Sequence, residues 1–322
     1  MQNTHGELPQ TAHTYVAADG SADYTSIQAA IDAVPVHNTG DVVIHIRPGI
    51  YTERIEISGD KPYITLSGEG AKPDDTVITY NLHAGGTEEN GDITTTFRTA
   101  TVNIYSNYFC ARNLSMVNSY DGSGNGGRQA LALYASAEHL KFENCIFRGA
   151  QDTLYAREGS QLYRNCYIEG DVDFIFGGAR AVFEKCEIHS INVNPVEEPE
   201  KGGYIAAPST PAGQKYGFLF VDCRMTADNA PNTVFLGRPW HPGSDPQAVG
   251  SCVFMRCELG AHIREDGWKR HMGSFLSKNA RLYEYENHGP GAAAHEARPQ
   301  LTGEQAAEYT VERVLGWADI QI

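Results

Sequence analysis

The chain repeats one short pattern of apolar and polar positions, in which an aromatic residue is followed by two mostly polar residues, a cysteine, any residue and an apolar residue. An earlier variant of the pattern at 111–116 has Leu114 in place of the cysteine. The cysteines of the first three complete copies are 21 and 20 residues apart, and the later gaps of 37 and 34 residues are interpreted as single turns that carry loop insertions. The five complete copies lie at residues 142–147, 163–168, 183–188, 220–225 and 254–259.

Each copy predicts a short β-strand whose residues alternate between an inner and an outer face. Such a strand cannot bury its inner face alone, so the copies are expected to stack, each adding one rung to a continuous core. A period of about 20 residues with Gly and Asn turns is typical of a parallel β-helix. We therefore predict an all-β protein, a right-handed single-stranded parallel β-helix with short flanking helices. A leucine-rich repeat has a similar period, but its Leu-x-x-Leu-x-Leu pattern is missing.

An amphipathic helix is predicted at about 26–34, because four apolar residues follow the i, i+3, i+4, i+7 spacing of one helical face. These residues are Ile27, Ala30, Ile31 and Val34. Thr25 and Gln28 have the spacing of a capping box at its start. This helix is expected to cover the first rung of the solenoid, since the ends of a solenoid need to be capped.

A second helix is predicted near the other end, at about 303–314. Thr302 and Gln305 repeat the capping-box spacing ahead of the apolar residues Ala306, Tyr309, Val311 and Leu315. No low-complexity linker separates the two ends. The sequence thus predicts that residues 1–322 form one β-helix domain.

The composition argues against nucleic-acid binding, membrane insertion and metal binding. The 40 acidic residues outnumber the 25 basic ones, and the formal net charge of −15 would repel a phosphate backbone, so no nucleic-acid partner is expected. The longest apolar runs, such as 42–46, are far shorter than the ~20 residues that span a bilayer, so no membrane partner is expected. The seven cysteines form no CxxC pair and no Cys/His cluster at zinc spacing, which predicts no metal site.

The candidate chemistry lies within the repeat itself. Asp152 and Asp173 each follow the cysteine of their coil by seven residues, so they are expected to stack on adjacent rungs about 4.8 Å apart. Gln151 precedes Asp152, and Gln129 lies about one coil further back. Any one such Asp is more often a solvated turn residue, but two Asp and two Gln in register favour a shared site. No Gly-x-Ser-x-Gly elbow supports a serine hydrolase.

A further candidate is the segment Gly-Arg-Pro-Trp at 237–240, where a rigid proline separates a cation from a large aromatic ring. Arg238 could pair with a carboxylate, and Trp240 could provide a platform for a sugar ring. A buried tryptophan beside a surface arginine is an equally good interpretation of these residues alone.

Taken together, five segments resemble the signature segments of the pectinesterases, also called pectin methylesterases, and occur in that family's order. The most specific are Asp-Phe-Ile-Phe-Gly at 173–177 and Gly-Arg-Pro-Trp at 237–240, and the segment 204–210 resembles the bacterial branch of the family. The resemblance implies a right-handed parallel β-helix that hydrolyses the methyl ester of galacturonate in pectin, releasing methanol, without a metal or cofactor. The five segments are 49–53, 129–133, 149–154, 170–177 and 236–240.

The resemblance also implies roles for individual residues. Asp173 matches the nucleophile and Asp152 the general acid/base, while Gln129 and Gln151 match the residues that hold the oxyanion. Arg238 matches the residue that orients the nucleophile, and its charge is expected to lower the pKa of Asp173. Asp152 lies close to the negative charge of Asp173 and is therefore expected to hold its proton more tightly. The expected substrate-binding residues are Thr96, Gln129, Val172, Phe176, Arg238, Trp240 and Met272.

Methyl-esterified pectin or oligogalacturonate is the expected partner, and the protein is expected to be a monomer. Cys145, Cys166 and Cys186 should lie on successive rungs within disulfide range of one another. The resemblance to bacterial relatives implies a Cys166–Cys186 bridge, whereas a ladder of reduced thiols is the alternative. A bridge would place the protein in an oxidising compartment, secreted or periplasmic. The first fifteen residues contain no secretory signal.

Four other functions use a similar scaffold. A polygalacturonase-type glycosidase also uses paired carboxylates, but its Gly-His-Gly and Asn-Thr-Asp segments are absent. A pectate lyase would need a Ca²⁺ site, and no acidic loop of that kind is present. A noncatalytic polysaccharide-binding β-helix and a thioesterase remain open alternatives.

Overall fold

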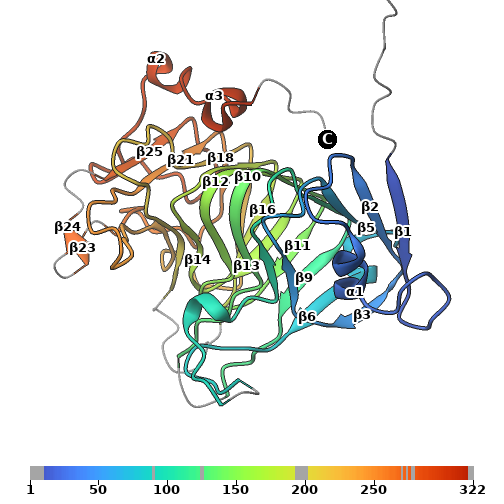
Figure 1. Ribbon diagram of the computed structural model, residues 1–322. Helices are drawn as coiled ribbons and strands as arrows, with labels where there is room; N and C mark the ends of the chain where they lie inside the picture. The colour runs from blue at the N-terminus through green and yellow to red at the C-terminus, as the bar shows by residue number, and fades with distance from the viewer. Residues whose placement is uncertain are drawn as a thin grey trace, which may run out of the picture.

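The computed structural model describes residues 11–88, 91–123, 127–192, 202–269, 271–272, 275–276 and 280–317. The chain winds into stacked coils, and the strands of its two large sheets pair in parallel along the length of the molecule (Figure 1). Equivalent strands of successive coils are neighbours, for example β12 (Leu154–Arg164) and β15 (Arg180–Glu184). The expected all-β parallel β-helix with short flanking helices is confirmed.

The strands form three faces. We name them the back row, the front row and the side sheet. The back row contains β1 (Ala12–Val16), β2 (Val42–Ile46), β5 (Ile64–Gly68), β8 (Cys110–Arg112), β15, β18 (Phe218–Val221), β21 (Ser251–Met255) and β25 (Arg281–Tyr285). The front row contains β4 (Ile55–Ile57), β7 (Val102–Ile104), β14 (Val172–Gly177), β17 (Tyr204–Pro208) and β20 (Phe235–Gly237). The side sheet contains β3 (Gly49–Thr52), β6 (Thr76–Tyr80), β9 (Ser115–Asn118), β11 (Ile146–Arg148), β13 (Tyr167–Gly170), β16 (Glu187–Ser190), β19 (Arg224–Ala227) and β22 (Glu258–Leu259).

Two long strands join the front and back rows. The first half of β10 (Leu133–Glu143) pairs with β7 and its second half with β8. In the same way β12 pairs first with β14 and then with β15. A short antiparallel hairpin, β23 (His271–Met272) with β24 (Phe275–Leu276), and two 3-10 turns, η1 (Pro73–Asp75) and η2 (Thr96–Arg98), complete the strands and turns.

The residue before the cysteine of each repeat forms a one-residue turn from the back row to the side sheet. Each such residue has a φ between 50° and 54°, in the left-handed region that Asn and Asp tolerate best. Three of the six are Asn and one is Asp, which explains this polar position of the repeat. The six residues are Asn113, Asn144, Asn165, Lys185, Asp222 and Arg256.

Lys185 is exposed and takes this left-handed conformation, which its long side chain does not favour. Lys185→Asn is expected to raise the free energy of unfolding by roughly 0.5–1 kcal/mol, because Asn is several-fold enriched in this backbone region. Thermal or urea unfolding measures the change. Lys185→Gln is the control, since it removes the same charge without the left-handed preference, and equal stabilisation by both variants would contradict the explanation.

The aromatic position of the repeat builds the core of the solenoid. Phe142, Tyr163, Phe183, Phe220 and Phe254 form one column of stacked rings, with neighbouring centroids 4.3–4.7 Å apart. All five side chains are fully buried. The period of the sequence is thus the period of a continuous aromatic stack.

The cysteine position of the repeat forms a parallel column of thiols. The predicted Cys166–Cys186 bridge is wrong, because all seven cysteines are free thiols. Cys166 Sγ donates a hydrogen bond to the carbonyl oxygen of Phe142 at 3.5 Å, and Cys186 Sγ donates to that of Tyr163 at 3.4 Å. The spacing of about 4.8 Å between in-register coils lies within the Cα range of disulfides, so the reason is the direction of the thiols, each of which donates to a carbonyl of the preceding coil. The oxidising compartment inferred from the bridge therefore loses its support.

Helix α1 (Ile27–Ala33) covers the first coils and buries Ile27, Ala30 and Ile31 against β1, β2 and β4. Its N-cap is Ser26, one residue after the expected Thr25. The carboxylate of Glu53 accepts hydrogen bonds from Ser26 Oγ and from the backbone N–H of Ile27 and Gln28. A carboxylate 26 residues away thus does what the local capping box was expected to do.

Two short helices replace the single one predicted at 303–314. Helix α2 (Gly303–Ala306) starts with the expected Thr302–Gln305 capping box. The chain then becomes extended at Thr310, whose side chain caps a new helix, α3 (Val311–Leu315). The single-helix prediction is wrong because Thr310 accepts from the N–H of Arg313 and so starts a helix where the first was expected to continue.

The C-terminal segment returns over the outer face of the back row. Val314, Leu315 and Trp317 pack there against Leu162 and Val182. Trp317 Nε1 donates to Ser160 Oγ at 2.8 Å, and its ring stacks on His139 with centroids 5.1 Å apart. The last described residue of the chain therefore contacts coils near the middle of the chain. Helix α3 lies beside β12 and β15 of these coils (Figure 1).

A buried ion pair joins the last coil to this C-terminal segment. Arg298 donates through Nε and Nη2 to the carboxylate of Glu284 in β25, at 2.8 and 2.6 Å. The two side chains are 1% and 2% exposed. Trp268 Nε1 and Asn287 Nδ2 also donate to Glu284, so the carboxylate is well supplied with donors.

Candidate active site

Two aspartates lie side by side at the start of front-row strands. Asp152 comes just before β12, and Asp173 lies in β14. Leu154 is the register partner of Ile175, so the two aspartates occupy equivalent places on adjacent coils, as their spacing predicted. The N–H of Asp152 donates to the carbonyl of Val172 at 3.0 Å. Both residues have positive φ, 65° and 52°, which aims both side chains from tight turns.

Arg238 follows β20 and holds Asp173. Its Nε donates to Asp173 Oδ1 at 2.6 Å, and its Nη2 donates to Oδ2. Burial raises the pKa of Asp173, which is 7% exposed, and the bond and charge of Arg238 oppose that rise. The expected net lowering of this pKa is wrong, because burial outweighs the guanidinium.

Asp152 has a different electrostatic environment. Its pKa is raised well above the ordinary value, first by burial and then by the negative charge of Asp173. The charge of Arg238 lowers this pKa by less, since the guanidinium is hydrogen-bonded to Asp173. The pair therefore offers one carboxylate held in an ion pair and one carboxyl whose pKa is raised well above its ordinary value, which is the division that acid-assisted nucleophilic chemistry requires.

Gln129 and Gln151 lie next to the aspartates in the candidate site. They are partners in a parallel β-bridge, and the N–H of Ala130 donates to the carbonyl of Gln151 at 3.1 Å. Their side chains line the same cleft as Asp152 and Asp173. Two amide groups thus lie next to two carboxylates, and amide N–H groups are donors that can stabilise a developing oxyanion.

The cleft has a volume of about 220 Å³. Of the expected substrate-binding residues, Thr96, Phe176 and Trp240 line it together with Gln129 and Arg238. Val172 lies in β14, half-buried, and is not among the lining residues. Met272 lies in β23, and its side chain is outside the described part of the chain. The lining residues are Thr96, Phe97, Gln129, Gln151, Asp152, Asp173, Phe176, Ala207, Arg238 and Trp240.

Sequence reasoning missed two rings, Phe97 and Tyr155, of an aromatic strip that also contains the predicted Phe176 and Trp240. Tyr155 stacks on Phe176 with centroids 4.3 Å apart, and Trp240 meets the edge of Phe176 at 5.7 Å. Phe97, 42% exposed, leans on Tyr155 at 5.3 Å. Tyr155 could have been found from strand alternation, because it follows the inward-facing Leu154. Such a strip suits the apolar faces of sugar rings.

Sequence reasoning also missed an ion pair behind the site. Arg128 Nη2 lies 2.6 Å from Asp171 Oδ2, and Asp171 Oδ1 accepts from the N–H of Val172 at 2.7 Å. Asp171 is 6% exposed, and its negative charge contributes to the raised pKa values of Asp152 and Asp173. The sequence positions could have indicated this ion pair, since Arg128 adjoins Gln129 and Asp171 is two residues from Asp173.

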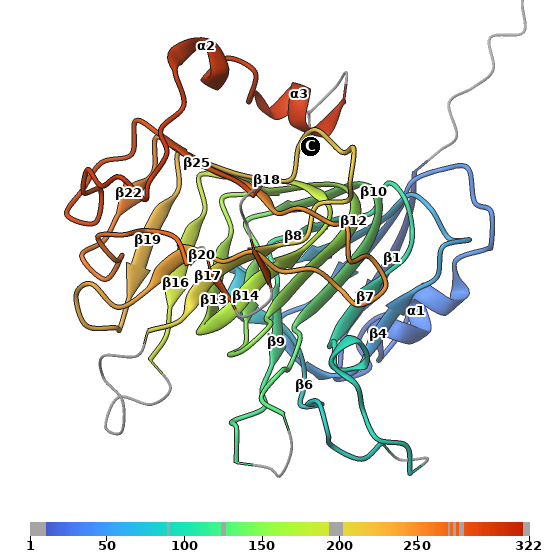
Figure 2. The same ribbon diagram turned by 90° about the vertical axis from the view of Figure 1, so that its left-hand side faces the viewer.

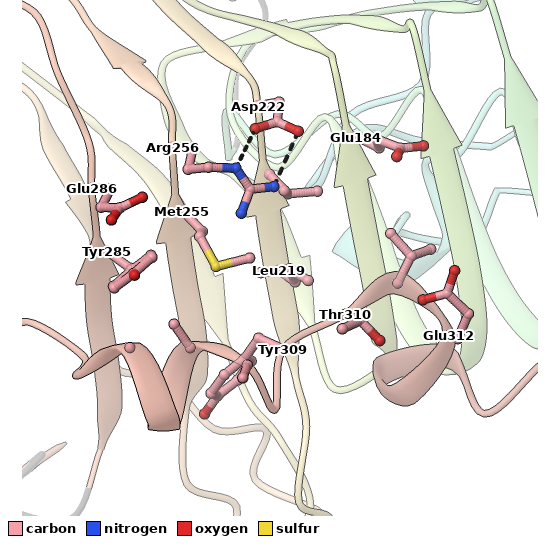
Figure 3. A pocket seen from close by; sticks show the side chains of 15 residues that line it. Glu184, Leu219, Asp222, Met255, Arg256, Tyr285, Glu286, Tyr309, Thr310 and Glu312 are labelled. Carbon is pink, nitrogen blue, oxygen red and sulfur yellow. Dashed lines mark hydrogen bonds and ion pairs between the residues drawn. The ribbon is translucent and has the colours of Figure 1, made fainter.

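A larger hollow of about 490 Å³ lies elsewhere, between the C-terminal helices and the outer face of the back row (Figure 3). Its most prominent charged groups are Asp222 and Arg256, which pair with each other and are 39% and 44% exposed. Solvated, mutually neutralised groups of this kind are poor candidates for catalysis. The smaller cleft with the aspartates is therefore the candidate site.

No three or more His, Cys, Asp or Glu side chains gather as a possible metal-binding group in the described ranges. No helix among the same residues is long and apolar enough to cross a membrane.

The fold is a parallel β-helix, and its candidate site holds a pair of stacked carboxylates. The chain belongs to the pectinesterase family, whose sequence profile matches residues 13–317. Members of this family are carboxylic ester hydrolases, so the predicted family and enzyme class are confirmed.

Relatives from plants and bacteria match over nearly the whole chain. Pectinesterase 31 of Arabidopsis thaliana is 36% identical over 311 residues, covering 94% of this chain and 92% of the relative. Pectinesterase A of Dickeya chrysanthemi is 33% identical over 349 residues, covering 98% and 93%. A solved pectin methylesterase in complex with a hexasaccharide has a TM-score of 0.87 at 30% identity, covering 97% of this chain and 99% of that one.

Proposed function

We propose that the protein demethylates methyl-esterified galacturonate in pectin by nucleophilic catalysis at Asp173. The observation that carries the proposal is the Asp152–Asp173–Arg238 arrangement beside two glutamines in one cleft. The hexasaccharide in the similar solved structure supports a pectin-derived oligosaccharide as the ligand. The rings of Phe97, Phe176 and Trp240, which line the cleft, offer it an apolar surface.

In the first half-reaction an Asp173 carboxylate oxygen attacks the carbonyl carbon of the methyl ester. Arg238 fixes the carboxylate through two hydrogen bonds, so the attacking oxygen has one orientation. The carbonyl oxygen becomes an oxyanion, which Gln129 and Gln151 stabilise through their amide N–H groups. Asp152 donates its proton to the methoxy oxygen, methanol leaves, and an acyl-enzyme anhydride remains on Asp173.

In the second half-reaction Asp152, now a carboxylate, takes a proton from water, and the hydroxide attacks the acyl carbon. Asp173 leaves as a carboxylate, Asp152 is protonated again, and the product acid releases one proton to solvent. Each turnover therefore yields one methanol, one galacturonate carboxylate and one proton. The raised pKa of Asp152 suits it to both proton transfers.

The proposal is tested by following methanol, acid and reducing ends together on methylated pectin. Methanol and acid are expected to appear in equal amounts, with no new reducing ends. Reducing ends without methanol would indicate a glycosidase, and binding without either product would indicate a noncatalytic protein.

Removal of the charge on Asp171 is expected to move the pH profile toward acid. Asp173 must be ionised and Asp152 protonated, so their pKa values set the acid and basic limbs of kcat/KM. Because the charge of Asp171 raises both pKa values, Asp171→Asn should shift both limbs down by roughly half a unit. Asp74→Asn, on a surface carboxylate paired with Arg148, is the control. An unchanged profile, or a shift to higher pH, would contradict the role of Asp171.

We further propose that the protein works as a monomer outside the cytoplasm, where pectin is found. A monomer of 35.2 kDa is expected in sedimentation experiments.

A further inference from the structure

The guanidinium of Arg238 has a second contact besides Asp173. Its Cζ lies 4.6 Å from the centre of the Tyr204 ring, so the planar cation rests on an aromatic face. The Arg238 side chain is 18% exposed, and a cation–π contact is stronger when water is largely excluded. Tyr204 is not among the residues that line the cleft, so it faces Arg238 and not the substrate space.

Tyr204 is itself held by a second ring. It stacks on Phe235 with centroids 5.4 Å apart and an interplanar angle of 10°. The stack follows from register, because Tyr204 in β17 is the partner of Phe235 in β20, and these strands are neighbours in the front row (Figure 2). Arg264 Cζ lies 4.6 Å from the centre of the Phe235 ring. Two rings thus form a column between two guanidinium groups.

The backbone fixes this column to the coil of the nucleophile. The N–H of Tyr204 donates to the carbonyl of Asp171 at 3.2 Å, and Tyr204 pairs in register with Val172, next to Asp173. The N–H of Arg238 donates to the carbonyl of Ala206 at 2.9 Å. Strand β17 therefore contacts Arg238 at both ends, through Ala206 at its backbone and through Tyr204 at its guanidinium.

We propose that Tyr204 is a positioning residue that holds the plane of the Arg238 guanidinium so that its two N–H groups meet the carboxylate of Asp173. The inference rests on the proposed function, since it assigns Tyr204 to the same reaction. The arginine side chain has several rotatable bonds, and its fork needs a fixed plane to donate two parallel hydrogen bonds. The Tyr204 ring supports the face of the guanidinium, while Asp173 accepts hydrogen bonds from its N–H groups.

Removing the ring should therefore act on Asp173 through Arg238. Three charged or titratable groups face Asp173: Asp152 from the preceding coil, Asp171 from its own coil and Arg238 from the coil after the next. Arg238 is the one that lowers the pKa of Asp173, so a loosened Arg238 lets that pKa rise. The acid limb of the kcat/KM profile should then move to higher pH.

The test compares Tyr204→Leu with Tyr204→Phe. Tyr204→Leu is expected to lower kcat for methanol release about tenfold, as loss of a desolvated cation–π contact would, with KM within about twofold of the parent because the cleft lining is intact. The acid limb should shift upward by about half a unit or more. Tyr204→Phe keeps the ring without the hydroxyl and is expected to restore kcat and the pH profile to within about twofold of the parent.

Phe235→Leu provides a second variant in which Tyr204 and Arg238 are unchanged. It should produce a smaller effect in the same direction, with a shift of the acid limb, since it removes only the support of Tyr204. Circular dichroism and thermal unfolding identify variants that fail to fold.

Three results would overturn the inference: a folded Tyr204→Leu protein with the parent's kcat and acid limb, equal impairment of the Leu and Phe variants, or a loss confined to KM. A parent protein that releases no methanol would instead overturn the proposed function, so the two failures can be told apart.

Discussion

Asp173→Asn is expected to lower kcat for methanol release by about 10⁴- to 10⁶-fold, the range seen when a nucleophile is removed from a preorganised site. The amide has nearly the same shape as the carboxylate, so the cleft should keep its form. It carries no charge and is a poor nucleophile, and it cannot accept two hydrogen bonds from Arg238 as the carboxylate does. Substrate binding should be weakened much less than turnover, because the sugar-facing rings remain.

The chain provides a matched control in Asp222→Asn. Asp222 also sits in a left-handed turn with φ 54°, and it also accepts two hydrogen bonds from an arginine, Arg256, at 2.8 and 3.2 Å. It lines the larger hollow (Figure 3) and is not among the residues that line the cleft of Asp152. Its variant should keep kcat within about twofold. Asp173→Asn with more than about one hundredth of the parent's kcat would refute the assignment of the nucleophile.

Arg298→Met is expected to be the most destabilising of the substitutions considered, by about 3–5 kcal/mol. It leaves the carboxylate of Glu284, which is 2% exposed, without its cationic partner. Trp268 and Asn287 still donate to that carboxylate, but two neutral donors do not replace a guanidinium. Urea unfolding at neutral pH measures the change.

Two further variants test the explanation by desolvation. Glu284→Gln combined with Arg298→Met removes the stranded charge and should recover part of the loss. Arg256→Met breaks an exposed pair of the same type and should change stability by less than about 1 kcal/mol. If the buried and the exposed variants destabilised the protein equally, burial would not be the cause.

Repetition made the fold predictable from sequence. The aromatic and cysteine positions of the repeat recur at one structural place in every coil, so their period gave the stacking and the register of Asp152 with Asp173. Arg238 could be placed on Asp173 only through the family resemblance, because the two residues are 65 positions apart and no period connects them.

Other features depend on contacts that no local pattern encodes. Glu53 caps α1 from a distant turn, and Arg128 reaches Asp171 across two coils. The pKa of Asp173 was mispredicted because sequence shows the partner, Arg238, but not the depth of burial. The disulfide was mispredicted because spacing places Cys166 and Cys186 on neighbouring coils but does not show the direction of each thiol, and both thiols donate to carbonyls of the preceding coil.

The return of the C-terminal segment has a consequence for biosynthesis. The hydrogen bond from Trp317 to Ser160 joins residues 157 positions apart. At about 5–20 residues per second, a ribosome needs roughly 8–30 s to travel that distance. During this time the coils that carry Leu162 and Val182 have been made, but the residues that cover their outer face have not. A nascent chain therefore exposes this apolar surface until α3 has been synthesised, and a message truncated before α3 would yield a product prone to aggregation.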